Sequence, residues 1–341
     1  MRAATAHRLA RAGTSLLWRG DFQGARQLLR AMDRRVGGAG PACADPAEAF
    51  RLHRRARAHR ARVLDRLLVE LADDHTVALR RAPDVREACH AAYGPPTGPA
   101  LVPLRELLGV IGAHQWRLKG VEVPALGARI HPHYGVFAPT RSEYVDLVAE
   151  APLPATVRRD PAAATAFDLG TGTGVLAAVL ARRGVGRIVG TDINPRALVC
   201  AEDNAHRLGL GGRLTVAPGL YPPGRADLVV CNPPWLPGRP SAALELGVYD
   251  EGGGMLRGFL GGLMEHLRPG GEGWLILSDL AEHLGLRTRD ELLELIETAG
   301  LRVVDRIDVR PRHRRASDVF DPLHAARAAE TTTLWRLSPA P

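Results

Sequence analysis

The chain has 341 residues and a formal net charge of +8 at pH 7, with 45% hydrophobic and 24% charged residues. This composition is that of an ordinary globular protein, and the length allows two domains or one large domain with an appendage. No run of eighteen apolar residues occurs and the N-terminus lacks a continuous apolar core, so we expect neither a membrane span nor a cleaved secretory signal. The cysteines are widely spaced and form no CxxC pair, which predicts reduced thiols in a cytoplasmic protein; they are Cys43, Cys89, Cys200 and Cys231.

The positive charge is concentrated near the N-terminus. Residues 1–71 hold 15 Arg and 6 Asp or Glu, an excess of nine positive charges, and the remainder is close to neutral. Two interpretations follow from this distribution. The region forms a basic face that binds nucleic acid or an acidic partner, or it forms solvated helical surfaces.

The first third of the chain carries apolar residues at spacings of three and four, which predicts helices over residues 1–93, including one long helix over 58–74. Glycine and proline interrupt this pattern at 37–46 and 94–99. Another helix is predicted over 101–118, followed by a short β-hairpin. We therefore expect a basic helical N-terminal domain for substrate recognition over 1–118, and a hairpin plus catalytic domain over 119–341.

From residue 141 onward, predicted strands alternate regularly with predicted helices. Such alternation is typical of an α/β fold with a parallel sheet and right-handed crossovers. The helix over 288–300 begins with a capping box, Thr288 with Glu291. The seven expected strands are 165–170, 187–193, 213–218, 226–232, 273–279, 301–309 and 331–338.

A glycine-rich loop, DLGTGTGVLA, follows the first of these strands and begins a helix. Gly170, Gly172 and Gly174 permit a tight turn and close approach of a ligand, while the helix N-terminus offers free N–H groups. Asp192 ends the second strand, where its carboxylate can accept hydrogen bonds from both hydroxyls of a ribose. The loop therefore predicts a nucleotide-like ligand at the carboxyl edge of the sheet.

The loop leaves three ligand classes open. Gly172, Gly174 and Ala177 satisfy G-x-G-x-x-A, which is compatible with a nicotinamide dehydrogenase. Asp168, just before the glycines, would repel a pyrophosphate but attract the amino group and sulfonium of S-adenosylmethionine. The methyl donor is therefore favoured over a dinucleotide. A non-catalytic module that binds S-adenosylmethionine or a nucleotide is the third possibility.

Three motifs in order, DLGTGTG, GTDINPRAL and NPPW, resemble the class I S-adenosylmethionine-dependent methyltransferases of the methyltransferase small-domain group. The resemblance covers residues 128–341 and implies a seven-stranded Rossmann-like sheet. It also implies methylation of a planar nitrogen. By the resemblance, Asn232 and the Pro233 carbonyl accept the two N–H bonds of that nitrogen, Trp235 stacks on the planar group, and the Pro233-Pro234 unit holds these parts rigid.

The hairpin and the segment GVFAPTRSE are similar to those of release-factor glutamine methyltransferases, which also carry a helical N-terminal domain. That likeness implies a glutamine-type side-chain nitrogen of a protein or peptide as acceptor. Two departures stand out: Trp235 replaces the commoner tyrosine, and Gly219 stands where an acidic residue often meets adenine. The likeness implies further donor contacts at Phe137, Pro139, Thr140, Thr171, Ile193, Asn194 and Leu220.

Other acceptors remain open. The arginine-rich N-terminal region is compatible with an exocyclic amine of RNA or DNA, and a small-molecule nitrogen is a further alternative. The basic loop 310–315 either contacts an acidic substrate or RNA or is solvated. His131 and His133 lack a third ligand nearby, so we expect no metal.

Overall fold

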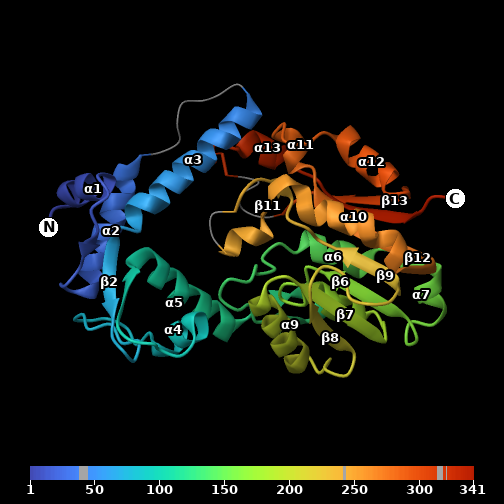
Figure 1. The fold of residues 1–341 in the computed structure, drawn as a ribbon, viewed down its shortest axis with the longest axis horizontal. Coiled ribbons are helices and arrows are strands. Elements are labelled where there is room, and N and C mark those ends of the chain that lie inside the picture. The colour runs from blue at the N-terminus through green and yellow to red at the C-terminus, as the bar shows by residue number, and fades with distance from the viewer. Residues whose placement is uncertain (38–44, 241–242, 313–317, 320) are drawn as a thin grey trace. The chain divides into compact units, whose positions relative to one another are not determined.

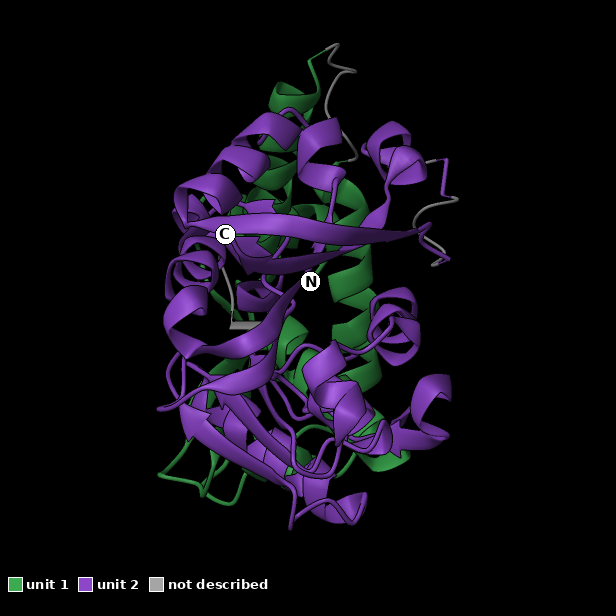
Figure 2. Cartoon of the chain, turned by 90° about the vertical axis from the view of Figure 1, so that its right-hand side faces the viewer, with its two compact units in different colours: residues 1–119 green, residues 120–341 purple. Residues whose placement is uncertain are grey.

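The computed structural model describes residues 1–37, 45–240, 243–312, 318–319 and 321–341. The chain forms two compact units, the N-terminal unit Met1–Lys119 and the sheet unit Gly120–Pro341 (Figures 1 and 2). Cys43 and residues 313–315 of the basic loop lie outside the described residues, so the predictions made for them are not addressed by the structure.

The N-terminal unit is not purely helical, and this corrects the prediction. The helix expected over 58–74 ends at Leu64, and residues 67–71 form the middle strand of a three-stranded sheet. Alternate residues of this strand, Leu67, Val69 and Leu71, are buried, which is the period of a strand. The predicted helix over 101–118 likewise begins only at Leu104. The elements of the unit are α1 (Ala3–Arg11), β1 (Leu16–Leu17), α2 (Phe22–Val36), α3 (Pro46–Leu64), β2 (Leu67–Leu71), α4 (Arg86–Tyr93), β3 (Ala100–Pro103) and α5 (Leu104–Lys119).

The sheet unit contains the expected hairpin and the expected seven-stranded sheet. The hairpin strands are β4 (Val121–Val123) and β5 (Ala128–Ile130), which pair antiparallel. The large sheet has the order β13-β14-β12-β9-β6-β7-β8. Its strands are β6 (Thr165–Leu169), β7 (Arg187–Asp192), β8 (Leu214–Pro218), β9 (Ala226–Cys231), β12 (Leu267–Ser278), β13 (Leu301–Val309) and β14 (Thr332–Pro339).

One strand departs from the parallel sheet that alternation predicts. β14 pairs antiparallel with both β12 and β13, while the β12–β9, β9–β6, β6–β7 and β7–β8 pairs are parallel. The parallel strands β6 and β9 are buried along their whole length. Strands covered on both faces need apolar runs rather than alternation, and this explains sequences such as ADLVVC.

Helices cover both faces of the sheet. On one face α6 and α8 pack with the hairpin into one apolar cluster, and on the other α10 and α12 pack into a second (Figure 1). The helices and 3-10 turns of the unit are η1 (Pro124–Leu126), α6 (Glu143–Glu150), α7 (Ala155–Arg159), α8 (Val175–Arg182), α9 (Pro195–Arg207), η2 (Ala243–Gly247), η3 (Glu251–Gly253), α10 (Gly254–His266), α11 (Leu280–His283), α12 (Arg289–Thr298) and α13 (His324–Ala329). Two short strands, β10 (Leu236–Pro237) and β11 (Tyr249–Asp250), pair with each other.

Two helix boundaries show how local sequence acts. The capping box at Thr288 and Glu291 forms as predicted at the start of α12. Helix α10 ends at His266, because Pro269 cannot donate within a helix and the glycines after it are poor helix formers. These residues join the start of β12, where the pairing with β9 shifts register between Leu267 and Glu272. Among the described residues, no helix has the length and apolar content needed to cross a membrane.

Candidate active site

The carboxyl ends of three neighbouring strands bring the predicted motifs together. Leu169 at the end of β6 pairs with Thr191 of β7 on one side and with Cys231 of β9 on the other. The residues that follow these strands therefore emerge side by side at one edge of the sheet. At this edge the strand order reverses between β6 and β9, which is where open α/β sheets bind ligands.

The glycine loop forms the turn that the sequence predicts. Gly170, Gly172 and Gly174 all have positive φ, at 69°, 55° and 78°. A side chain at Gly172 would meet only the Gly170 carbonyl oxygen, 3.9 Å away, so the loop surface there is open. At Gly170, in contrast, an added Cβ would meet the Cε atom of Met255. The loop therefore exposes backbone without side chains at Gly172, and Met255 packs against it at Gly170.

Asp168 is 1% exposed and its carboxylate is hydrogen-bonded into the loop. Its Oδ2 accepts hydrogen bonds from the Thr171 hydroxyl at 2.7 Å and the Ala177 N–H at 3.1 Å. Burial raises the pKa of Asp168 to about 6, the charge of Asp192 adds to the rise, and the two hydrogen bonds oppose it. Asp168 therefore fixes the loop and is also a buried carboxylate close to the site.

Asp192 ties the end of β7 to the glycine loop. Its Oδ2 accepts a hydrogen bond from the Gly172 N–H at 3.0 Å, and its Oδ1 accepts one from the Asn194 N–H at 2.8 Å. Burial raises the pKa of Asp192 above its usual value. Asn194 in turn caps α9 by accepting from the Arg196 N–H. The neighbouring Ile193 is 77% exposed, so the strand end presents apolar surface beside a carboxylate.

The NPPW segment follows β9 with Asn232 partly exposed and Cys231 fully buried in the core below it. The Trp235 Nε1–H donates to Oδ1 of Asn232 at 2.8 Å. An indole N–H can only donate, so this bond identifies the atom that faces it as the amide oxygen. That oxygen keeps its second lone pair for a further donor.

The remaining residues that we predict to contact the methyl donor differ in their exposure to solvent. Phe137 and Thr140 are exposed and Pro139 is buried. Thr171 is buried beneath the loop, and the Leu220 carbonyl accepts a hydrogen bond from the Thr191 hydroxyl. His133 pairs with Asp203 at 3.1 Å, and the described residues contain no cluster of three metal-ligating side chains.

Two groups at this edge were not predicted as site residues. Asp250 accepts hydrogen bonds from the Met255 and Leu256 N–H groups and so caps α10, which places Met255 against the glycine loop. Arg141 stacks over Trp235 with its Cζ 4.9 Å from the ring centroid. Arg141 also binds the buried Glu330, which follows α13 and precedes β14. The sequence separation of 189 residues leaves no local signal for this pair.

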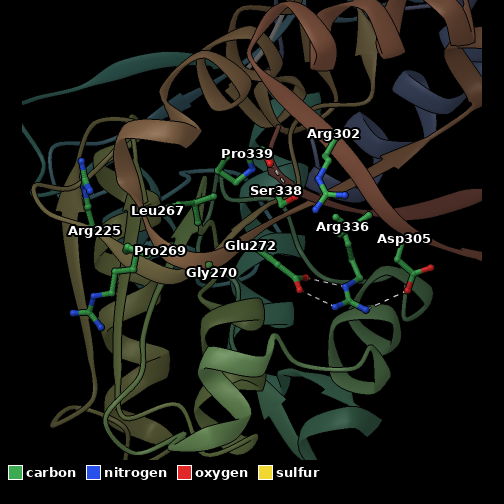
Figure 3. A pocket seen from close by; sticks show the side chains of 13 residues that line it. Arg225, Leu267, Pro269, Gly270, Glu272, Arg302, Asp305, Arg336, Ser338 and Pro339 are labelled. Carbon is green, nitrogen blue, oxygen red and sulfur yellow. Dashed lines mark hydrogen bonds and ion pairs between the residues drawn. The ribbon is translucent and has the colours of Figure 1, made fainter. Parts of the chain in front are cut away.

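A pocket of about 740 Å³ lies elsewhere in the sheet unit (Figure 3). It is lined by the starts of β12 and β13 and by the end of β14. Leu267 in its lining pairs with Ala226, the first residue of β9, whereas Asn232 follows the last residue of that strand. The pocket is therefore at the opposite edge from the glycine loop. Its Arg336 is paired with Glu272 and Asp305 (Figure 3).

Comparison with known proteins shows what the sheet unit is similar to. The release factor glutamine methyltransferase of Cereibacter sphaeroides is 35% identical over 153 residues, 40% of this chain and 52% of that protein. The ribosomal protein L11 methyltransferase of Pelotomaculum thermopropionicum is 49% identical over 71 residues, 20% of this chain and 23% of that protein. The solved structure of ribosomal protein L11 methylase from Lactobacillus delbrueckii subsp. bulgaricus is 18% identical with a TM-score of 0.39, covering 62% of this chain and 86% of that one.

The chain thus spans about half the length of the release factor glutamine methyltransferase that it matches and about a quarter of the L11 methyltransferase. Residues 127–286, from the hairpin to the turn after α11, match the family model of the methyltransferase small domain.

Proposed function

We propose that the protein transfers a methyl group from S-adenosylmethionine to a side-chain nitrogen of a polypeptide, of the glutamine-amide type. The observation that carries the proposal is the register of β7, β6 and β9, which sets Asp192, the glycine loop and Asn232 next to one another at one edge of the sheet. A donor platform and an amide oxygen suited to hold an acceptor are thereby adjacent.

The residues at this edge fit the methyl donor. Gly172 leaves open backbone where a side chain would stand, Asp192 offers a carboxylate to ribose hydroxyls, and Ile193 offers apolar surface to the base. The buried carboxylate of Asp168 favours a ligand with positive charge. When bound, S-adenosylmethionine supplies a methyl group whose S–C bond breaks as the acceptor nitrogen forms the new N–C bond, so the sulfur leaves neutral.

The acceptor side follows from the NPPW segment. An amide nitrogen has a delocalised lone pair and is a weak nucleophile, so holding it in place is the main contribution the protein can make. In this proposal Oδ1 of Asn232 and the Pro233 carbonyl accept its two N–H bonds. The proton that the nitrogen loses passes to solvent after transfer, so no strong general base is needed.

A polypeptide acceptor is favoured over nucleic acid by the proteins that the sheet unit resembles. The relatives that match it are named for release factors and ribosomal protein L11.

The buried thiols fit a reducing compartment. Cys89, Cys200 and Cys231 are free and buried among the described residues. Burial also raises the pKa of Cys89 to about 11, which leaves it unreactive at neutral pH. We therefore propose that the protein acts in the cytoplasm, where glutathione keeps such thiols reduced.

The acceptor class can be tested with radiolabelled methyl donor added to a lysate of cells that lack the gene, with and without the purified protein. Label that protease releases and nuclease does not supports the proposal. Label that only nuclease releases assigns the activity to RNA or DNA, and label in neither polymer indicates a small molecule. The Asn232→Ala protein is the control for labelling by other enzymes in the lysate. A nucleic-acid acceptor would also show binding that falls steeply with salt.

A further inference from the structure

A chain of contacts connects Glu330, which lies between α13 and the last strand, to the acceptor side of the candidate site. Glu330 accepts two hydrogen bonds from Arg141, at 3.0 and 3.1 Å. The Arg141 guanidinium lies over the ring of Trp235, and the Trp235 N–H donates to Oδ1 of Asn232. These four residues come from three separate parts of the sequence, and each contacts the next.

The first pair of this chain is buried and held from several directions. Glu330 is 1% exposed and also accepts a hydrogen bond from the Ser278 hydroxyl at 2.7 Å. The Arg141 Nε lies 3.6 Å from Oε1 of Glu143, another buried carboxylate, and this oxygen has no hydrogen-bond partner among the described residues. A guanidinium between two buried carboxylates has little freedom to move, because its displacement would leave a buried charge without a partner.

Trp235 occupies the position between this pair and the acceptor group. Its ring packs against the apolar clusters on both faces of the sheet, and Arg141 covers one face of the ring. That face is therefore not available to stack on a substrate. Because the ring is held, its N–H points at Asn232 before any substrate arrives, and the remaining lone pair of Oδ1 has a defined direction.

We propose that Arg141 and Glu330 are positioning residues, which act through the Trp235 indole to orient the acceptor-binding oxygen of Asn232. The inference rests on the proposed methyl transfer for its kinetic consequence, but the contact chain itself can be measured without turnover. A planar guanidinium is required at position 141, because it must hold Glu330 with two hydrogen bonds and lie over the indole at the same time.

The kinetic test uses Arg141→Lys, which keeps the charge but loses the planar fork. We expect kcat for the labelled acceptor to fall roughly 10- to 100-fold, the effect of small misplacement in a positioned site. The dissociation constant of the methyl donor should change less than about twofold, since the pair faces the acceptor side. The same loss is expected for Glu330→Gln and for Trp235→Phe, which removes the N–H.

A double variant tests whether Arg141 acts through the indole. In the Trp235→Phe background the ring no longer contacts Asn232 by a hydrogen bond, so adding Arg141→Lys should lower kcat by less than about twofold more. Multiplied effects of the two substitutions would overturn the inference. Arg289→Lys is the matched control, because Arg289 also pairs with a glutamate, Glu282, and stacks over a tryptophan, Trp335. Its kcat should stay near that of the wild type.

The turnover-independent readout is the exchange of the Trp235 indole proton with solvent, followed in ¹⁵N spectra and assigned by its loss in Trp235→Phe. Arg141→Lys should speed this exchange roughly 10-fold, the scale of one weakened hydrogen bond, while Arg289→Lys should not. Unchanged exchange in Arg141→Lys overturns the inference. If the wild type labels no polypeptide but the exchange responds as expected, the proposed acceptor is wrong and the positioning role stands.

Discussion

Oδ2 of Asp192 accepts a hydrogen bond from the Gly172 N–H at 3.0 Å, so the end of β7 holds the glycine loop in place. Asp192→Ala removes this bond, the bond from the Asn194 N–H and the carboxylate that we propose binds the ribose hydroxyls. We expect the dissociation constant of S-adenosylmethionine to rise at least about 10-fold, since hydrogen bonds to a charged group contribute roughly 1.5–3 kcal/mol. Isothermal titration calorimetry measures the change.

The matched control for Asp192 is Asp203→Ala, which removes a carboxylate of the same unit that pairs with His133 and Arg207. Its donor affinity should remain within about twofold of the wild type, the range of ordinary surface substitutions. Equal losses of affinity in the two variants would show that Asp192 acts through the general stability of the unit.

Donor binding should depend on pH through Asp168. Burial raises the pKa of Asp168 to about 6, so this carboxyl is mostly protonated below that pH in the free protein. A cationic donor favours the ionised form, and its dissociation constant should therefore rise about 10-fold per pH unit below pH 6. Titration calorimetry between pH 5 and pH 7.5 tests this. Asp168→Asn should bind more weakly and lose most of this slope; an identical slope in that variant would assign the titration to another group.

The same pKa shift has the opposite consequence for the free protein. Because the folded-state pKa of Asp168 lies above the usual value of 3.8 for an aspartate, the folded protein binds this proton more tightly than the unfolded chain does. The contribution of this group to stability is therefore present below the unfolded value and is lost as pH rises through about 6. Denaturant unfolding without donor measures the unfolding free energy at each pH. Between about pH 4 and pH 6, this free energy should depend less on pH in Asp168→Asn than in the wild type.

Gly170 and Gly212 provide a test of the loop's backbone. Alanine at Gly170 would have a φ of 69° and a Cβ against Met255, and the left-handed conformation alone costs about 1–2 kcal/mol. Urea unfolding should show Gly170→Ala destabilised by at least that amount. Adding Met255→Ala should relieve the clash with the new Cβ but leave the cost of the left-handed backbone. Gly212→Ala, whose Cβ would meet nothing within 4 Å, should change stability by less than about 0.5 kcal/mol. A Gly170→Ala protein as stable as Gly212→Ala would contradict the observed turn.

The sheet unit was predictable because each of its signals is local. The apolar run of β9, the glycines after β6 and the capping box at Thr288 each specify backbone conformation within a few residues. The strand β2 was mistaken for helix, since LLVEL fits both periods and only pairing with β1 and β3 decides. The antiparallel direction of β14 is seen only in its pairing with β12 and β13, which composition does not specify.

The site was predictable to a smaller extent. The motifs predicted that Asn232 and Asp192 lie near each other, because the ends of neighbouring parallel strands meet at one edge of the sheet. Nothing in the sequence indicated that Trp235 donates to Asn232, or that Arg141 meets Glu330 across 189 residues. Such contacts depend on side-chain directions in the folded core, and these are set by packing from all sides.

Asn232→Ala separates acceptor alignment from donor binding. The substitution removes the oxygen that Trp235 orients and that we propose receives an N–H of the acceptor. We expect kcat to fall about 100-fold or more, the scale seen when one oriented polar partner is removed from a transition state. Donor affinity should stay within about twofold, because we assign donor binding to the glycine loop and to Asp192. Asn232→Asp keeps an acceptor oxygen for the Trp235 N–H, so it should retain more activity than Asn232→Ala if the oxygen is what matters. Single-turnover rates at saturating donor measure both variants, and full activity in Asn232→Ala would remove the residue from the acceptor site.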